Sequence, residues 1–187
     1  MTPKKIKNVS KFLSFVLRHK PDAIGLDLDQ NGWANINELI NKGNGSAEVS
    51  DLSYSLIQQV VASNDKKRFL ISEDGLSIRA NQGHSIKVDL QLKPTEPPEW
   101  LYHGTATRFL ESIMATGLTS QARQHVHLST NLDTARAVGQ RYGEPVILTI
   151  NAQQMHQRGL PFYLSENGVW LTEHVPTQYI SNRPDVC

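Results

Sequence analysis

The sequence predicts an α+β protein with two lobes, and three observations support this prediction. The first part of the 187-residue chain shows helix-type apolar spacing three times and then a hairpin signal. The second part mixes short strand-like runs with irregularly placed helices, which disfavours a doubly wound parallel sheet. Between the two parts, Pro94, Pro97 and Pro98 interrupt regular structure. We therefore expect an N-terminal lobe over residues 1–82, a linker over residues 83–99 and a C-terminal lobe over residues 100–187.

The first expected helix ends near His19. One face of it is apolar at the spacing i, i+3, i+4, i+7, i+8, formed by Val9, Phe12, Leu13, Val16 and Leu17. Pro21 disfavours helical geometry at Lys20, which places Arg18 and His19 in the last turn. Cations there stabilise a helix through its dipole. The alternative interpretation is that a rigid element aims Arg18 and His19 at an anion.

Two more helices and a hairpin complete the expected N-terminal lobe. The second helix carries Ile36, Leu39 and Ile40 and ends at Gly43; the third begins after a Ser50-Asp51 cap and carries Leu52, Leu56 and Val60. Asp74-Gly75 is a type I′ turn signal that would place Ile71 opposite Ile78. Three helices followed by a hairpin are typical of a winged-helix module.

The C-terminal lobe is expected to begin with a strand over residues 100–105. A helix with Leu110, Ile113 and Met114 should end at Gly117, and a second strand should cover residues 126–129. Thr130 or Asn131 could cap the helix that follows. Residues 146–150 read as a buried strand and residues 168–172 as another.

Composition excludes several classes of protein. The net charge is +1, so no global basic field exists to drive non-specific binding of nucleic acid, and an anionic partner must meet a local cluster. The single cysteine, Cys187, excludes a disulfide framework. No apolar run reaches membrane-spanning length. We expect a cytoplasmic monomer with no membrane partner.

The candidate site residues are histidines and arginines. The Rossmann and P-loop fingerprints are absent, and His125 and His127, on one side of a strand, lack a third metal ligand at suitable spacing. We therefore expect no metal. Arg123 would share the face of His127 if this strand starts early, and an arginine fork matches phosphate oxygens. His103 precedes Gly104, a small residue that could admit a ligand close to the backbone. The alternative interpretation is that His103 is an ordinary buried histidine.

Six ordered runs carry a resemblance that covers residues 9–180. They are SKFLSFVLRHKP (residues 10–21), DKKRF (65–69), IRANQGHS (78–85), LYHGT (101–105), HVHLS (125–129) and ENGVWLT (166–172). In these runs the chain resembles the NAD-dependent RNA 2′-phosphotransferases, also called tRNA 2′-phosphotransferases. The resemblance implies a winged-helix lobe joined to a mixed or antiparallel β lobe of the ADP-ribosyltransferase fold, which agrees with the two expected lobes.

The resemblance also implies an activity, a co-substrate and site residues. An internal RNA 2′-phosphate would be transferred to NAD⁺ through an ADP-ribosylated RNA intermediate, giving nicotinamide and ADP-ribose 1″,2″-cyclic phosphate, a reaction associated with tRNA splicing. The family's catalytic set falls on Arg18, His19, Arg68 and Arg123, and its NAD⁺ contacts fall on His103, Gly104, Thr105, His127 and Ser129. The stretch around residues 169–171 is apolar where many ADP-ribosyltransferases place a catalytic glutamate, and an anionic phosphate needs no base to become a nucleophile.

Two other functions stay open on the sequence alone. The protein could be a winged-helix DNA-binding regulator with a degenerate NAD-sensing lobe. It could also ADP-ribosylate terminal phosphates of nucleic acid and stop after the first step. The joint presence of Arg18, His19, Arg68 and Arg123 favours the phosphotransferase, because a sensor has little need of a complete phosphate-binding set.

Overall fold

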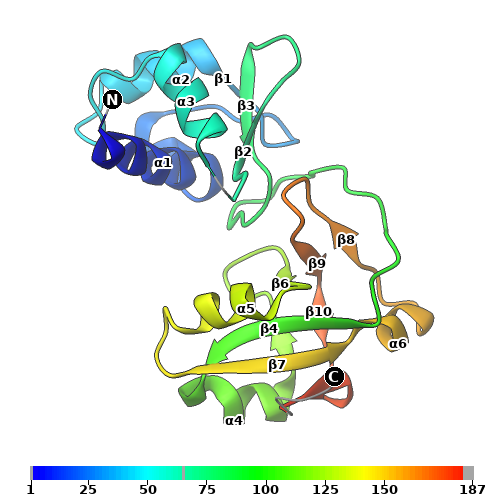
Figure 1. Cartoon of the computed structure of the whole chain (residues 1–187). Helices are drawn as coiled ribbons and strands as arrows, with labels where there is room; N and C mark the ends of the chain where they lie inside the picture. Colours follow the sequence, from blue (N-terminus) through cyan, green and yellow to red (C-terminus); the bar gives the residue numbers. More distant parts are fainter. Residues whose placement is uncertain (1, 65, 183–187) are drawn as a thin grey trace. The chain divides into compact units, whose positions relative to one another are not determined.

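The chain forms two compact units in a computed structural model that describes residues 2–64 and 66–182. The first unit is Met1–Gln91 and the second is Leu92–Cys187. Both combine helices with small antiparallel sheets, which confirms the predicted α+β class (Figure 1). Within the described residues, no helix is both long and apolar enough to span a bilayer.

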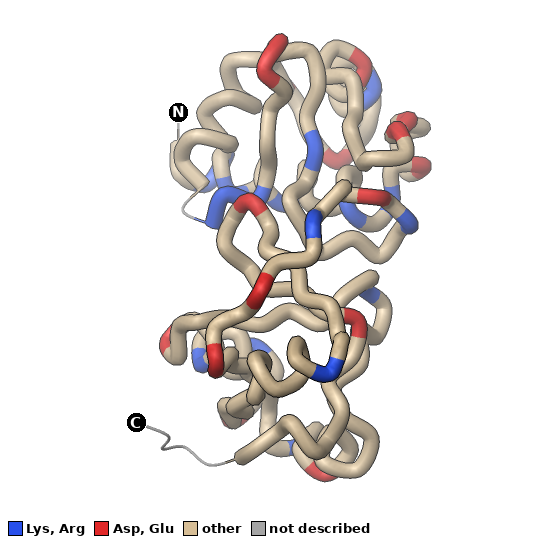
Figure 2. The backbone as a smooth tube through the Cα atoms, turned by 90° about the vertical axis from the view of Figure 1, so that its right-hand side faces the viewer, with Lys and Arg blue, Asp and Glu red and all other residues tan. Residues whose placement is uncertain are grey.

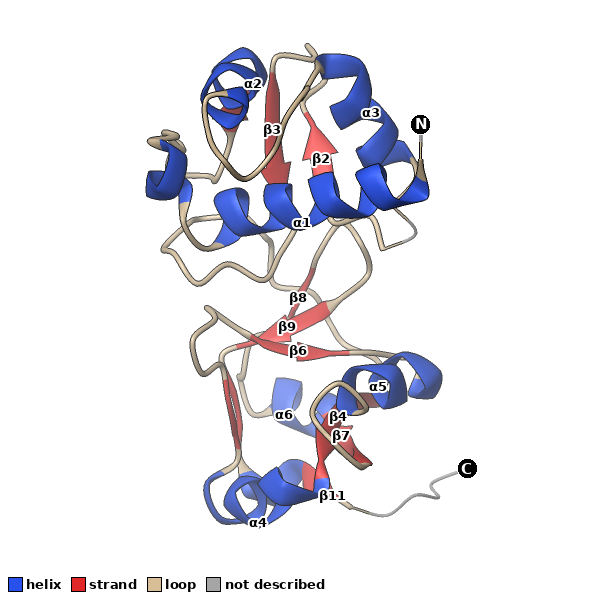
Figure 3. Ribbon diagram, turned by 90° about the vertical axis from the view of Figure 1, so that its left-hand side faces the viewer, coloured by secondary structure: helices blue, strands red, loops and turns tan. Residues whose placement is uncertain are grey.

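The first unit packs three α-helices against a three-stranded sheet. Its elements are α1 (Pro3–Arg18), the 3₁₀ helix η1 (Pro21–Ile24), β1 (Ala34–Asn35), α2 (Ile36–Asn44), α3 (Tyr54–Ala62), β2 (Phe69–Ile71) and β3 (Ser77–Ala80). The antiparallel strands follow the order β1-β3-β2, and α1 runs along one side of the unit (Figure 3). The apolar face predicted for α1 is buried in the core, where Leu13 and Leu17 join Leu39, Leu56 and Ile78.

Two helix boundaries in this unit differ from the prediction. Ser53, and not Ser50 or Asp51, caps α3, because the side chain of Asn44 hydrogen-bonds both the backbone N–H and the carbonyl of Leu52 at 2.7 and 2.8 Å. Leu52 is therefore buried in the segment before the helix begins. Gly43 lies inside α2 and does not end it, and a side chain there would crowd Leu52 and Phe12, at 3.0 and 3.3 Å from a Cβ.

The hairpin has the predicted register with a different turn. Ile71 pairs with Ile78 as expected. A type I′ turn needs positive φ at both central residues, whereas Gly75, at 73°, has positive φ and Asp74 does not. The Asp74 carboxylate instead accepts bonds from the Ser72 hydroxyl and the Leu76 backbone N–H at 2.6 and 2.9 Å, which hold the turn.

The second unit is built from three small sheets and three α-helices. Its strands are β4 (Trp100–Ala106), β5 (Leu118–Thr119), β6 (Val126–Leu128), β7 (Pro145–Asn151), β8 (Tyr163–Leu164), β9 (Trp170–Thr172), β10 (His174–Val175) and β11 (Ile180–Ser181). Its helices are α4 (Thr107–Thr116), α5 (Leu132–Gly139), α6 (Ala152–Gln157) and the 3₁₀ helix η2 (Thr177–Tyr179). Gly117 ends α4 and Asn131 caps α5, as predicted.

All strand pairs in the second unit are antiparallel. The sheets have the orders β11-β7-β4, β6-β9-β8 and β10-β5. Backbone bonds between Tyr102 and Ser129, at 2.8 and 2.9 Å, join the first two of these sheets. This junction places β4 beside the end of β6 and brings the histidines of both strands close together.

Candidate functional site

Three of the four candidate catalytic residues gather at the C-terminal end of α1 in the first unit. A guanidinium nitrogen of Arg18, Nη2, donates to the carbonyl of Arg68 over 3.5 Å, and the Arg18 Cζ lies 5.9 Å from the centre of the Phe69 ring. The Nη1 of Arg68 donates to the Asn64 side-chain oxygen at 3.0 Å. These contacts hold two guanidinium groups beside His19, the residue that follows α1.

Ser85 fixes the orientation of the His19 ring. The His19 Nδ1 and the Ser85 hydroxyl oxygen are 2.9 Å apart. The Ser85 backbone N–H donates in turn to the Arg18 carbonyl at 2.9 Å, so the segment after the hairpin is fastened to the end of α1. Composition and spacing did not single out Ser85, because it stands 66 residues from His19 in the sequence.

The neighbouring His84 is a neutral, buried imidazole at ordinary pH. Its side chain is 2% exposed, and neither ring nitrogen has a hydrogen-bond partner among the residues that the structure describes. Burial, with smaller contributions from the positive charges of Arg18, His19 and Arg79, lowers the pKa of His84 to about 4. His84 therefore adds no charge beside the arginines.

In the second unit, Arg123 lies beside His127. The Arg123 Nη1 is 3.3 Å from the His127 Nδ1. Because arginine can only donate, that ring nitrogen is the acceptor. The strand β6 begins at Val126, as predicted, so Arg123 lies before it and does not share a strand face with His127. Arg123 reaches His127 from the turn before the strand.

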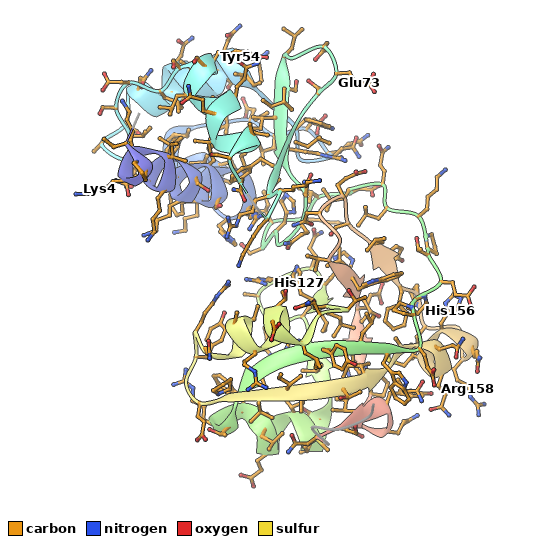
Figure 4. The ribbon with its side chains drawn as sticks, viewed as in Figure 1. Lys4, Tyr54, Glu73, His127, His156 and Arg158 are labelled. Atoms are coloured by element: carbon orange, nitrogen blue, oxygen red, sulfur yellow. The ribbon has the colours of Figure 1, made fainter. Side chains whose placement is uncertain are left out.

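His103 is held against the same strand. Its Nδ1 bonds to the carbonyl of His127 at 3.0 Å, which requires a proton on this nitrogen. Burial lowers the pKa of His103 and the charge of Arg123 lowers it further, while the hydrogen bond to His127 opposes both effects. The position of His127 is labelled in Figure 4. Ser129 follows β6, and its hydroxyl oxygen accepts a hydrogen bond from the Asn131 N–H at 3.0 Å.

Gly104 and Thr105 are buried, whereas the His103 side chain is only partly buried. A Cβ on Gly104 would lie 1.6 Å from the carbonyl oxygen of Ala135, so the missing side chain leaves room for α5. Thr105 is 6% exposed. Close packing against α5 explains the glycine at this position, and any contact with a ligand would have to use its backbone.

The histidine pair on β6 is divided between two environments. His125 packs edge-on against Tyr163, with ring centres 5.8 Å apart, while His127 bonds with Arg123 and His103. Burial lowers the pKa of His125, and Glu173 opposes this effect. Within residues 2–64 and 66–182, no three metal-ligating side chains converge.

Comparison with known proteins gives the family. A sequence model described as RNA 2′-phosphotransferase, Tpt1 / KptA family, matches residues 4–174. A protein of Acaryochloris marina named probable RNA 2′-phosphotransferase is 62% identical over 174 residues, which are 93% of this chain and 95% of the relative. Proteins with the same name from Pectobacterium carotovorum and Pseudomonas syringae are 55% and 46% identical, covering 98% and 99% of this chain and 98% of each relative.

An α+β protein that groups arginine and histidine side chains in both of its units is suited to handling phosphate groups. The matches make the class definite: the protein is a transferase. The chain belongs to the RNA 2′-phosphotransferase, Tpt1 / KptA family.

Proposed function

We propose that this protein removes an internal 2′-phosphate from RNA by transferring it to NAD⁺. The observation that carries the proposal is the cluster of Arg18, His19 and Arg68 at one end of α1, in a chain of this family. Two guanidinium groups and an imidazole, held by fixed contacts, form a suitable environment for a phosphate with two negative charges.

In the first proposed step, a 2′-phosphate oxygen attacks C1″ of the nicotinamide ribose. A C–O bond forms, the bond from C1″ to the nicotinamide nitrogen breaks, and its electron pair leaves with neutral nicotinamide. In the second step, the ribose 2″-hydroxyl attacks the phosphorus and the bond from phosphorus to the RNA 2′-oxygen breaks. The proton lost by the 2″-hydroxyl ends on that oxygen, so RNA with a free 2′-hydroxyl leaves together with ADP-ribose 1″,2″-cyclic phosphate.

His19 and the arginines are proposed to act mainly in the second step. That step develops extra negative charge on phosphate oxygens, which fixed cationic donors stabilise. His19 is suited to move the proton, since imidazole titrates near neutrality and the bond to Ser85 fixes its ring. Arg123 is proposed to take part in the same transfer.

The second unit is proposed to bind NAD⁺ through His103, His127 and Ser129, with Gly104 and Thr105 as the remaining contacts. Support comes from the hydrogen bond between the first two residues and from the backbone pairing that brings Ser129 to the same strand ends. The fit is uneven, because α5 covers Gly104 and Thr105 is buried. These two residues would contribute through the backbone and through the shape of the strand end.

We also infer that the first unit is a winged-helix module and the second has the ADP-ribosyltransferase fold. The sequence of three helices and a hairpin in the first unit supports the former. The small antiparallel sheets of the second unit are compatible with the latter. RNA that carries an internal 2′-phosphate and NAD⁺ would then be the two substrates.

The test measures nicotinamide release together with loss of the RNA 2′-phosphate. We expect equal amounts of both, no reaction without NAD⁺, and little effect of EDTA. His103→Ala should slow nicotinamide release without accumulation of an intermediate, because it weakens NAD⁺ binding. Loss of the phosphate at full rate without NAD⁺ would overturn the proposal.

A further inference from the structure

We propose that a basic groove along α1 binds the sugar–phosphate backbone of single-stranded RNA next to the 2′-phosphate, with Lys7 and Lys11 as its phosphate contacts. This inference rests on the proposed function, because it extends the substrate beyond the reacting phosphate. The groove has a volume of about 780 Å³ and lies between one face of α1 and the segments 60–64 and 66–68. His19 and Arg68 are part of its lining.

The charge of the groove fits a polyanion. Its cationic lining consists of Lys7, Lys11, Lys66 and Arg68, together with His19, and no acidic side chain belongs to the lining among the described residues. Figure 2 marks the lysines and arginines of this unit in blue. Arginine and lysine side chains along one groove are typical of surfaces that follow a nucleic-acid backbone.

Lys7 and Lys11, unlike Lys5 and Lys42 of the same unit, have no acidic partner among the described residues. Lys5 pairs with Asp51 at 3.5 Å, and Lys42 pairs with Glu38. Within the part of the chain that the structure describes, the side chains of Lys7 and Lys11 form neither ion pairs nor hydrogen bonds. Both are exposed and one helical turn apart, so their charges are available to a ligand.

The length of the groove requires an extended ligand. Lys7 and His19 are twelve residues apart, which is about 18 Å along a helix axis at the usual rise per residue. One phosphate cannot contact both. A 2′-phosphate at His19 and Arg68 therefore leaves Lys7 and Lys11 for phosphates of neighbouring nucleotides.

Apolar side chains in the groove suit the other part of a nucleotide. Ile6, Phe15 and Val60 belong to the lining, and Phe15 is partly exposed. An aromatic ring between cationic side chains can stack with a base of any identity. The groove should therefore bind RNA without preference for sequence. The hydroxyl groups of Ser10 and Ser14 add hydrogen-bond donors along the same face.

The experiment compares the full-length protein with the double variant Lys7→Ala, Lys11→Ala. Binding of 2′-phosphorylated RNAs, either a dinucleotide or an oligonucleotide extended on the 5′ or the 3′ side, is measured by fluorescence anisotropy over a range of salt concentrations. The matched control is Lys5→Ala, Lys42→Ala, which removes the same charge from the same unit outside the groove.

The double variant should bind one of the extended RNAs about 5- to 30-fold more weakly than the wild type, as expected for two exposed charge contacts. Its salt slope should fall by about 1.4, since each phosphate contact on a single strand contributes about 0.7. The control variant should bind as the wild type does. Equal affinity of the double variant and the wild type for both extended RNAs, or an equal loss in the control variant, would overturn the proposal.

The outcomes separate the groove from the proposed activity. If the wild type converts the substrate while the double variant binds extended RNA normally, the groove proposal fails and the activity stands. If the wild type converts nothing, but binding of extended RNA still depends on Lys7 and Lys11, the activity fails and the groove proposal is supported.

Discussion

Acidification should weaken the first unit through protonation of His84. The pKa of this imidazole is lowered from 6.5 to about 4 in the folded protein, mainly by burial. Between these two values the unfolded chain binds the proton and the folded chain does not. The contribution of His84 to stability is therefore complete above pH 6.5 and is lost as the pH falls towards 4.

The size of this effect follows from the two pKa values. Each pKa unit corresponds to about 1.4 kcal/mol, so lowering the pH from 7 to 5 should cost the first unit about 2 kcal/mol in free energy of unfolding. The folded state has little means of accepting this proton at lower cost, because Arg18, His19 and Arg79 all act against a positive charge at His84.

Native-state hydrogen exchange on peptides that cover α1 and β3 measures this free energy in the first unit alone. That restriction matters because burial also lowers the pKa of His103 and His125 in the second unit. His84→Gln should remove about 2 kcal/mol of the difference between pH 7 and pH 5, whatever it costs at pH 7. His156→Gln, in the second unit, is the control. An unchanged pH dependence in His84→Gln would refute the reasoning.

Three further outcomes are expected. Ser85→Ala should lower kcat about 2- to 10-fold with little change in KM, because one hydrogen bond that orients His19 is lost; a normal kcat would count against this role. His19→Ala and Arg123→Ala should slow the second step about 10²–10³-fold, so that ADP-ribosylated RNA accumulates as a slower-migrating species, and equal loss of both steps would contradict the division of labour. Gly104→Ala should lower the thermal midpoint, at a cost of about 3 kcal/mol or more from overpacking against α5, whereas Gly45→Ala should not; an unchanged midpoint in Gly104→Ala would argue against close packing.

The features that could be predicted from the sequence depend on neighbours along the chain. The apolar spacing of α1, the turn that pairs Ile71 with Ile78 and the cap at Asn131 each involve residues within a few positions of one another. For such features the preferences of the backbone and the burial of one face act together, and the structure confirms them.

The features that could not be predicted depend on distant residues. The start of α3 is set by Asn44, whose side chain hydrogen-bonds the backbone of Leu52 just before the helix. Ser85 reaches His19 across most of the first unit's sequence. A glycine is required at position 104 because α5, which begins almost thirty residues later, packs against it. Local spacing cannot distinguish close packing by a helix from the approach of a ligand.

The candidate functional residues divide in the same way. Arg18 and His19 were identified from the end of one helix, where a proline fixes the boundary. The joint action of Arg68, Arg123 and the histidines was expected only from the family resemblance. The structure adds a physical partner for several of them, including Asn64 for Arg68 and His127 for Arg123.

The fate of the phosphate tests the central claim most directly. An oligoribonucleotide with a radiolabelled internal 2′-phosphate is mixed with the protein and NAD⁺, and the labelled products are separated. The proposed mechanism predicts that all released label appears in ADP-ribose 1″,2″-cyclic phosphate, with RNA that carries a free 2′-hydroxyl as the other product. Label recovered only as inorganic phosphate would mean hydrolysis and would contradict the transfer to NAD⁺.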